Sequence, residues 1–227
     1  MIDGPFDAIV DSAERVSQVL TAGVRSVQLR IKTPERPDDA WRADLREAVR
    51  RSVAACREAD AELFVNDHWA LAHEVGAGGV HLGQEDLLAL GDAGRAVLAA
   101  SGLAVGVSSH SLWELCRARA LAPRYIACGP VWPTLTKAMP WRAQGLHNLA
   151  WWQRMAQVPV VAIGGILEAE QVRAAAQCGV DGVCVVRALG DVPAGTVPEL
   201  QRALREGRER TPRAPRDDFP NPSLAND

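Results

Sequence analysis

The sequence lacks three features that would each place it in a particular class of protein. It has no apolar run that approaches a membrane span, and no basic start followed by an apolar block. Its formal net charge is only −3, which gives no indication of binding to nucleic acid or to a membrane surface. We therefore expect a cytoplasmic protein without nucleic-acid or membrane partners.

Cysteine pairs of the kind that bind metals or exchange disulfides are also absent. The five cysteines are an odd set without a Cys-x-x-Cys motif, which is typical of a cytosolic protein whose thiols stay reduced. We expect all of them to be buried small residues, with Cys128 in the core. They are Cys56, Cys116, Cys128, Cys178 and Cys184.

What the chain does contain is a regular alternation of expected strands and helices. Its 227 residues, of which 48% are hydrophobic, are enough for one good-sized core. Short apolar runs predict about eight strands, at 7–11, 24–31, 63–65, 79–82, 103–107, 124–128, 158–163 and 182–186. Amphipathic stretches between them predict helices at 12–22, 40–59, 69–75, 87–101, 111–121, 147–157 and 167–178. This alternation favours a single α/β domain, a (β/α)8 TIM barrel, and an open doubly wound sheet is the alternative.

The composition changes near Glu206. Residues 206–227 are charged, proline-rich and poor in apolar residues, a composition typical of disorder. We therefore expect one barrel domain at residues 1–205 and a disordered tail at residues 206–227.

Two neighbouring strands lead into acidic residues. Leu63-Phe64-Val65 runs into Asn66-Asp67, and Asp86 follows the next expected strand. A short helix between these strands, closed by Gly76, makes them parallel neighbours that end on the same side. Two carboxylates brought together repel each other unless a cation lies between them, and so few oxygen ligands suit Mg²⁺. The alternative is that Asp67 and Asp86 are helix N-caps.

Basic residues and glycines follow other expected strands, on the barrel face where sites are built. The guanidinium of Arg30 has the rigid fork that suits phosphate. Gly164-Gly165 follows the seventh expected strand, where backbone N–H groups commonly hold a phosphate. The pattern predicts two phosphate-type sites, one with a metal and one without. Further polar residues at these strand ends are Gln28, Lys32, Ser108, Thr134, Thr136, Lys137 and Arg187.

Several of these residues also have a purely structural interpretation. A lone lysine such as Lys32 is more often a solvated surface charge. Shaping a turn would by itself explain the presence of Thr134. We expect His81 to have a structural or orienting role rather than a catalytic one. Trp132, beside Pro133, is a candidate to line a pocket. The tryptophans on helical patterns are predicted to pack in the interior: Trp41, Trp113, Trp151 and Trp152.

A series of motifs resembles the thiamine-phosphate synthase family, in the order in which that family has them, from about Ile9 to Leu189. The motifs are VQLRIK (27–32), FVND (64–67), GVHLGQEDL (79–87), GVSSHS (106–111), GPVWPTLTK (129–137) and VVAIGGI (160–166). The resemblance implies a (β/α)8 barrel enzyme that joins hydroxymethylpyrimidine diphosphate to thiazole phosphate. Its products would be thiamine phosphate and diphosphate.

The same resemblance implies a role for each matching residue. Mg²⁺ would be the cofactor, held by Asp67 and Asp86. The diphosphate would be held by Arg30, Lys32, Asn66 and Lys137, and the pyrimidine or the leaving group would contact Gln28 and Ser108. The thiazole substrate would meet Thr134 and Thr136, and its phosphate would bind Gly165 and the backbone around Val186 and Arg187. The expected catalytic residues are Arg30, Lys32, Lys137 and Ser108.

Elementary chemistry agrees with this assignment. Diphosphate is a good leaving group only if its charge is neutralised as the C–O bond breaks. Mg²⁺ and basic side chains would neutralise it without any protein nucleophile. We therefore expect a dissociative substitution in which the protein positions the substrates, neutralises charge and excludes water.

The chain departs from the family pattern in two places. Arg187 stands where family members usually have a serine, and we expect its guanidinium to strengthen binding of the thiazole phosphate. Asp7 and Ala8 stand where an aromatic residue and a proline are usual. We therefore expect a poorly formed first strand.

Three other functions compete with this interpretation. The first is a thiazole tautomerase, which shares the barrel and needs no metal, and the second is a phosphate-binding barrel isomerase. The third is a non-catalytic binder or regulator that retains the thiazole-phosphate pocket. The pair Asp67 and Asp86 argues against the tautomerase, because that reaction has no diphosphate to neutralise.

Overall fold

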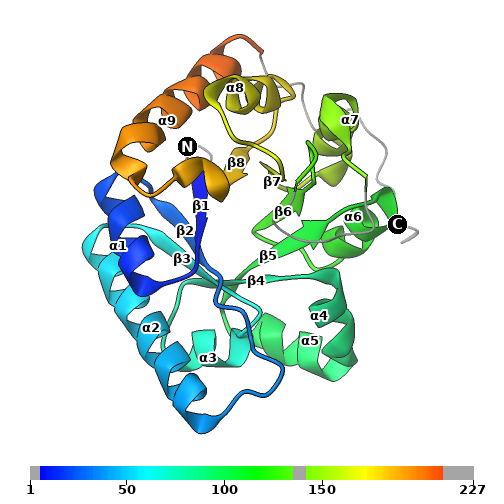
Figure 1. Ribbon diagram of the computed structural model, residues 1–227. Coiled ribbons are helices and arrows are strands. Elements are labelled where there is room, and N and C mark those ends of the chain that lie inside the picture. The colour runs from blue at the N-terminus through cyan, green and yellow to red at the C-terminus, as the bar shows by residue number, and fades with distance from the viewer. Residues whose placement is uncertain (1–5, 135–141, 212–227) are drawn as a thin grey trace.

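The computed structural model describes residues 6–134 and 142–211. Within them, eight parallel strands close into a barrel in the order β1-β2-β3-β4-β5-β6-β7-β8, and helices surround it (Figure 1). The strands are β1 Phe6–Val10, β2 Ser26–Leu29, β3 Glu62–Asn66, β4 Gly79–Leu82, β5 Ala104–Ser109, β6 Tyr125–Cys128, β7 Val160–Ile163 and β8 Gly182–Val185. The helices are α1 Ala13–Thr21, α2 Asp39–Glu58, α3 Trp69–Glu74, α4 Gln84–Ala89, α5 Gly91–Ala100, α6 Leu112–Arg119, α7 Gly145–Ala156, α8 Ala169–Gln177, the 3-10 helix η1 Arg187–Leu189 and α9 Pro193–Glu209. The predicted barrel is confirmed, and the alternative of an open sheet is wrong.

The first strand is well formed, so the prediction of a weak strand is wrong. β1 pairs with β2 from Asp7–Ser26 to Val10–Leu29, and with β8 from Phe6–Val183 to Ala8–Val185. Closure supplies hydrogen-bonding neighbours on both edges of a strand, so its conformation depends on those neighbours as well as on its own residues.

One predicted helix is two helices. The stretch predicted at 87–101 is divided between α4 and α5, and α4 already begins at Gln84. Gly91 at the junction has a φ of 61°, a left-handed conformation that glycine adopts without steric cost. The chain can therefore change direction there.

The last helix, α9, was not predicted. Its sequence contains Pro193 and Pro198, and proline weakens a helical pattern except in the first turn. The helix lies beside α8 in Figure 1, and it buries residues such as Leu200 and Leu204. It reaches Glu209, so it crosses the boundary at Glu206 where we expected the tail to begin. Residues 212–227, the rest of that predicted tail, lie outside the described residues.

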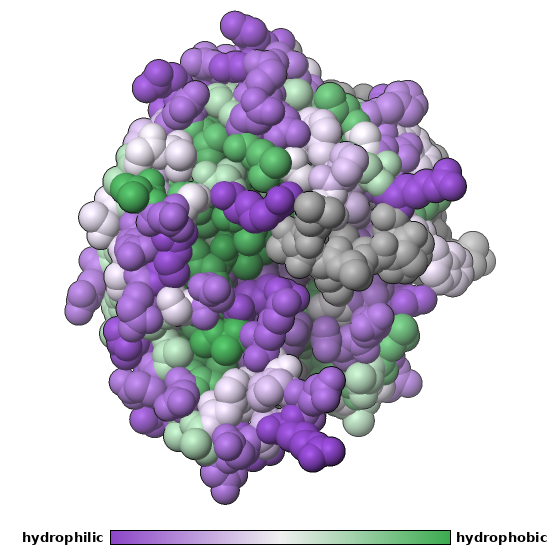
Figure 2. Space-filling model, in the orientation of Figure 1, coloured by the Kyte–Doolittle hydropathy of each residue, from purple (hydrophilic) through white to green (hydrophobic). Residues whose placement is uncertain are grey.

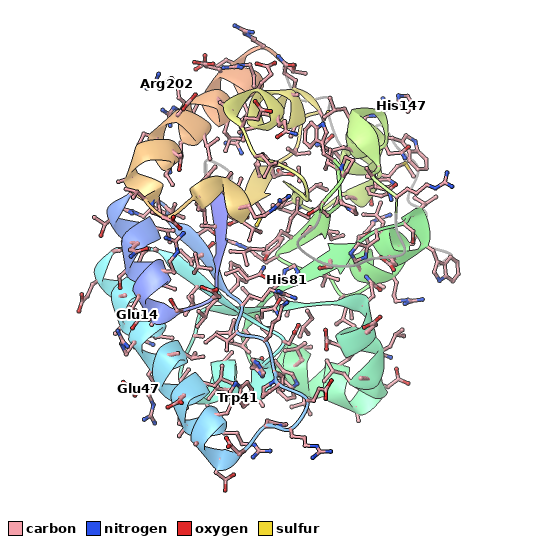
Figure 3. The ribbon with its side chains drawn as sticks, viewed as in Figure 1. Glu14, Trp41, Glu47, His81, His147 and Arg202 are labelled. Carbon is pink, nitrogen blue, oxygen red and sulfur yellow. The ribbon has the colours of Figure 1, made fainter. Side chains whose placement is uncertain are left out.

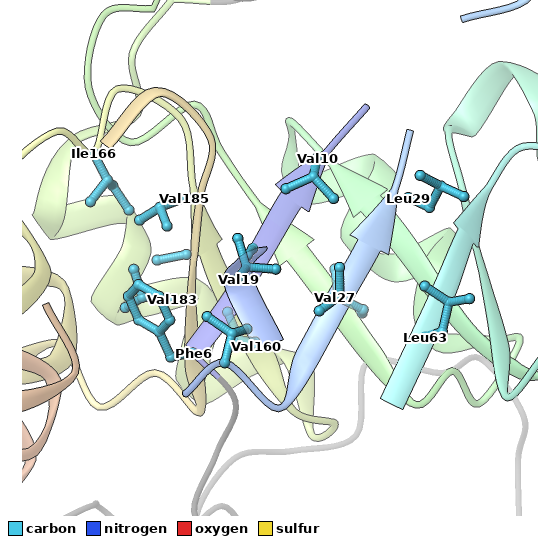
Figure 4. Close-up of a cluster of buried hydrophobic side chains, with 14 of the residues drawn as sticks. Phe6, Val10, Val19, Val27, Leu29, Leu63, Val160, Ile166, Val183 and Val185 are labelled. Atoms are coloured by element: carbon cyan, nitrogen blue, oxygen red, sulfur yellow. The ribbon is translucent and has the colours of Figure 1, made fainter. Parts of the chain in front are cut away.

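Apolar side chains fill the layer between the strands and the helices. Figure 4 shows Val19 of α1 among Phe6, Val10 and Val27 of the first two strands. All four side chains belong to the main buried cluster. Their burial is favourable because it removes apolar surface from water.

A second apolar cluster lies inside the barrel. Phe64 and Tyr125 meet edge to face there, with ring centroids 5.1 Å apart. Glycines make room for both rings. A Cβ at Gly79 would come within 2.6 Å of Phe64 Cε1, and one at Gly106 within 2.4 Å of Tyr125 Cζ. The barrel interior is thus a packed core and not an open channel.

Two predictions about burial need correction. Cys56, Cys128 and Cys184 are buried, but Cys116 is exposed and Cys178 is only partly buried. Trp113, predicted to pack, has 74% of its surface exposed, because it lies on the outer face of α6. The exposed fraction is 36% for Trp151, whereas Trp152 is buried, and Trp41 is partly buried against the core.

Candidate active site

A cavity of about 200 Å³ is formed by residues at and just beyond the carboxyl ends of the strands. Its apolar lining includes Ile9, Ile163 and Cys184. In Figure 2 hydrophobic residues lie in the middle of the visible face, between hydrophilic ones. The residues predicted for the site that line this cavity are Gln28, Arg30, Asn66, Asp67, Asp86, Ser108, Thr134, Gly165, Val186 and Arg187.

The carboxyls of Asp67 and Asp86 meet in this cavity. Asp67 follows β3 with a φ of 65°, and its backbone N–H donates to the carbonyl of His81 on β4 over 2.9 Å. Asp86 lies in the first turn of α4. Loss of hydration raises the pKa of Asp67, and the charge of Asp86 and a hydrogen bond with it raise that pKa further. A cation between the two carboxyls would relieve this repulsion.

The interpretation of the two aspartates as helix caps applies only in part. An oxygen of Asp86 accepts a hydrogen bond from the backbone N–H of Gly83, the N-cap of α4, over 3.2 Å. Residue 68, not Asp67, is the N-cap of α3. Asp67 therefore has no capping role that would explain its position.

The predicted basic residues have different positions. Arg30 lines the cavity, and its positive charge lowers the pKa of Asp67, against the larger effects that raise it. The side chain of Lys32 is exposed and is not part of the lining. Thr136 and Lys137 lie outside the described residues.

Two consecutive glycines form the wall of the cavity beyond β7. Gly164 and Gly165 have φ values of 94° and 72°. A Cβ at Gly164 would come within 2.6 Å of Pro130, and one at Gly165 within 2.6 Å of both Cβ and the backbone oxygen of Trp132. Only glycine fits both positions, and the backbone stays accessible from the cavity. Trp132 packs against this turn and is not part of the lining.

His81 occupies the centre of the barrel, where Figure 3 labels it. Its Nδ1 lies 2.9 Å from the hydroxyl of Tyr125, and its Nε2 lies 2.9 Å from Oγ of Ser108. Burial, aided by the positive charges of Arg30 and His110, lowers the pKa of His81 to about 4. The imidazole is therefore neutral near pH 7, which fits an orienting role.

One polar residue of the cavity had no predicted role. His110 lines the cavity just beyond β5, and its Nδ1 lies 2.9 Å from a carboxylate oxygen of Glu114. The same oxygen accepts from the backbone N–H of His110. The signal in the sequence is the spacing of four residues across a helix start, because His110 comes just before the N-cap Ser111 and Glu114 lies in the first turn of α6.

The donor set suits Mg²⁺. Within residues 6–134 and 142–211, no group of three or more His, Cys, Asp or Glu side chains could hold a metal ion. Mg²⁺ is commonly held by one or two carboxylates, and it takes its other oxygens from water and phosphate. Asp67 and Asp86 meet that requirement, whereas a structural zinc site would need more protein ligands.

The fold and the cavity define the class: a (β/α)8 barrel with its candidate site at the carboxyl ends of the strands. The family model described as "Thiamine monophosphate synthase" matches residues 5–189. The chain belongs to this family. The predicted family is therefore confirmed, and so is the prediction that the chain is an enzyme of thiamine-phosphate synthesis.

Individual relatives agree with the family. A thiamine-phosphate synthase of Rhizobium etli is 46% identical over 80% of this chain and 85% of its own length. One of Neisseria meningitidis serogroup B is 42% identical over 89% of this chain and 95% of its own. The solved thiamine phosphate pyrophosphorylase of Pyrococcus furiosus is 30% identical and superposes with a TM-score of 0.77, covering 90% of this chain and 97% of that one. A solved 3-hexulose-6-phosphate synthase, 18% identical with a TM-score of 0.59, shares the fold, covering 88% and 99% of the two chains.

Proposed function

We propose that this protein joins 4-amino-2-methyl-5-hydroxymethylpyrimidine diphosphate to thiazole phosphate and releases diphosphate. The observation that carries the proposal is the meeting of Asp67 and Asp86 in a cavity that Arg30 also lines. Paired carboxylates beside an arginine suit a metal-bound diphosphate. The family of the chain points to the same reaction.

In this proposal Asp67 and Asp86 hold Mg²⁺. When bound, the ion would neutralise charge on the diphosphate as it leaves. Arg30 and Asn66, which line the cavity at the ends of the neighbouring strands β2 and β3, would orient the diphosphate by charge and by hydrogen bonds. Lys32 and Lys137 would add positive charge.

The thiazole phosphate would bind at the opposite wall. Gly165 offers its backbone there, and Val186 and Arg187 line the same wall at the end of β8. A phosphate bound to backbone N–H groups and to the guanidinium of Arg187 would receive several hydrogen bonds. Thr134 and Thr136 would contact the thiazole ring.

The reaction would proceed without a protein nucleophile. Cys184 lines the cavity, but burial raises the pKa of its thiol well above the usual value, so the reactive thiolate is scarce. His81 is neutral and hydrogen-bonded at both ring nitrogens. The amino group of the pyrimidine would stabilise the cation left when the diphosphate departs, and the thiazole nitrogen would then attack it. Apolar residues such as Ile9 and Ile163 would keep water away from that cation.

The test is to mix the purified protein with both substrates, with and without Mg²⁺, and to measure thiamine phosphate by mass spectrometry. We expect product only with the metal and with both substrates. Asp67→Ala should abolish turnover and keep the fold, whereas Glu85→Ala, at an exposed position outside the lining, should keep both. Activity unaffected by EDTA would favour a tautomerase. Binding of thiazole phosphate without product under any metal would favour a non-catalytic binder.

We also infer that the protein works in the cytoplasm on small molecules. All five cysteines are unpaired thiols, as in reducing compartments. Among the described residues no helix is both long and apolar enough to cross a membrane.

A further inference from the structure

The side chain of Gln171, in the first turn of α8, is bonded to the backbone that joins β7 to this helix. Its Nε2 donates to the carbonyl oxygen of Gly165 over 3.1 Å. Its Oε1 accepts from the backbone N–H of Leu167 over 2.7 Å and from that of Glu168 over 3.3 Å. The amide of Gln171 therefore fixes the chain directly after the glycine turn.

The backbone partners decide which way the amide of Gln171 is turned. A backbone N–H can only donate a hydrogen bond, and a carbonyl oxygen can only accept one. The NH2 group must therefore face Gly165, and the oxygen must face Leu167 and Glu168. The opposite orientation would place donor against donor and acceptor against acceptor.

The direction of each carbonyl in this turn decides the direction of the N–H that follows it. Within residues 6–134 and 142–211 the only cis peptide bond precedes Pro130, so the bonds of the glycine turn are trans. In a trans peptide the C=O and the following N–H point in opposite directions. Because the carbonyl of Gly165 faces Gln171, the N–H of Ile166 points away from Gln171.

The preceding peptide is fixed in the same way. The carbonyl of Gly164 accepts from the backbone N–H of Trp132 over 3.0 Å. The N–H of Gly165 therefore points away from Trp132, which packs against the outside of the turn.

These two N–H groups belong to residues that line the cavity, Gly165 and Ile166. The side chain of Ile166 is part of the main buried cluster, where Figure 4 labels it, so the backbone is what Ile166 can offer to the cavity. Neither N–H donates to another group in the part of the chain that the structure describes. The N–H groups of Leu167 and Glu168, in contrast, are bonded to Gln171.

We propose that Gln171 is a positioning residue for the thiazole phosphate: it holds the carbonyl of Gly165 away from the cavity, so that the N–H of Ile166 binds the phosphate together with the N–H of Gly165. Backbone N–H groups bind anions well, whereas a carbonyl oxygen turned into the cavity would repel them. The identity of the phosphate ester rests on the proposed function, and the directions of the N–H groups do not.

The N–H directions are tested on the wild-type protein with inorganic phosphate and no substrate. In the assigned amide NMR spectrum we expect added phosphate to shift the signals of Gly165 and Ile166. The signals of Leu167 and Glu168 should shift much less, because Gln171 already binds these groups. An unshifted Ile166 signal, or equal shifts at all four amides, would overturn the proposal.

Two substitutions test the action of Gln171. Gln171→Met keeps the length of the side chain and removes both its donor and its acceptor. Gln171→Glu keeps an acceptor for the two N–H groups and loses the donor to Gly165. We expect each variant to raise KM for thiazole phosphate about tenfold, the usual effect of losing one hydrogen bond, with little change in KM for the pyrimidine diphosphate.

The pair of variants separates positioning from two other effects. A rise in KM confined to Gln171→Met would show that Gln171 only holds the start of α8, and the proposal would fail. A rise confined to Gln171→Glu would be an effect of the added negative charge, and the proposal would fail as well.

The matched control is Gln177→Met, the same change at an exposed position at the end of α8, which should leave both KM values unchanged. If Gln171→Met does not fold, the phosphate titration of the wild-type protein decides the question. If the wild-type protein makes no product, the proposed function fails, and the titration still tests the direction of the N–H groups.

Discussion

The carboxyl of Asp67, which follows β3, interacts with the carboxyl of Asp86 on α4; burial raises the pKa of Asp67, and the charge of Asp86 raises it further. Two groups of like charge in one cavity destabilise the protein unless a ligand uses them. Their position is therefore more easily explained by metal binding than by the stability of the chain alone.

Replacing Asp67 by Asn should separate function from stability. Asp67→Asn removes a ligand for the metal, and we expect turnover to fall by about 100-fold or more. It also removes the repulsion from Asp86, so the melting temperature without metal should stay the same or rise at about pH 7. Steady-state kinetics and a thermal melt check both outcomes. The control is Glu85→Gln at an exposed position of α4. If Asp67→Asn melted at a much lower temperature than the wild type, this account of the two aspartates would be contradicted.

Replacing Arg187 tests the departure from the family pattern. Arg187 lines the cavity after β8, the neighbour of the strand that Gly165 follows. Arg187→Ser should raise KM for thiazole phosphate about tenfold through the loss of a charge-assisted hydrogen bond. Turnover at saturation should change little. Arg202→Ser, on the exposed side of α9 and far from His81 in Figure 3, is the matched control. A lower KM in Arg187→Ser would show that the arginine disturbs the site.

The glycine turn beyond β7 should not tolerate a side chain. Gly165→Ala combines a positive φ with a Cβ 2.6 Å from Trp132, and we expect the free energy of unfolding to fall by about 2–4 kcal/mol. Gly102→Ala has a similar φ of 77° but no atom within 4 Å, and it should cost only about 1 kcal/mol. Urea denaturation of both variants measures the difference. Equal losses would show that close packing is unimportant at this turn.

A buried carboxyl should make stability depend on pH. Burial raises the pKa of Asp7 to about 7, the charge of Glu62 adds to the shift, and a hydrogen bond with Ser26 opposes it. The folded state binds this proton more tightly than the unfolded state, whose aspartate has a pKa of about 3.9. The contribution of Asp7 to stability is therefore fully present below about pH 4 and is lost as pH rises towards 7.

Asp7→Asn should remove that dependence. At about pH 8 we expect the variant to be more stable than the wild type by on the order of 2–4 kcal/mol, and at about pH 4 the two should be nearly equal. Urea unfolding at both pH values measures the difference. A difference that does not change with pH would show that Asp7 is charged and well accommodated in the folded protein.

The local pattern of apolar and polar residues was enough to predict most of the fold. Apolar runs predicted each of the strands, and most predicted helices lie within a few residues of the observed ones. The errors have physical causes. Proline in α9 weakened its pattern, and Gly91 divided one expected helix into two. The strength of β1 depends on its pairing with β8, whose residues are far away in the sequence.

The sequence by itself determined that Asp67 and Asp86 end on the same side of two neighbouring strands, because a short crossover leaves parallel strands no other arrangement. It also placed two consecutive glycines, Gly164 and Gly165, directly after the seventh expected strand. Only the tertiary structure decided that the side chain of Lys32 is exposed and outside the cavity lining, that Trp132 packs against Gly165, and that His81 links Tyr125 to Ser108. These contacts join residues far apart in the chain, and the closure of the barrel brings them together, whereas periodicity reports only on neighbours along the sequence.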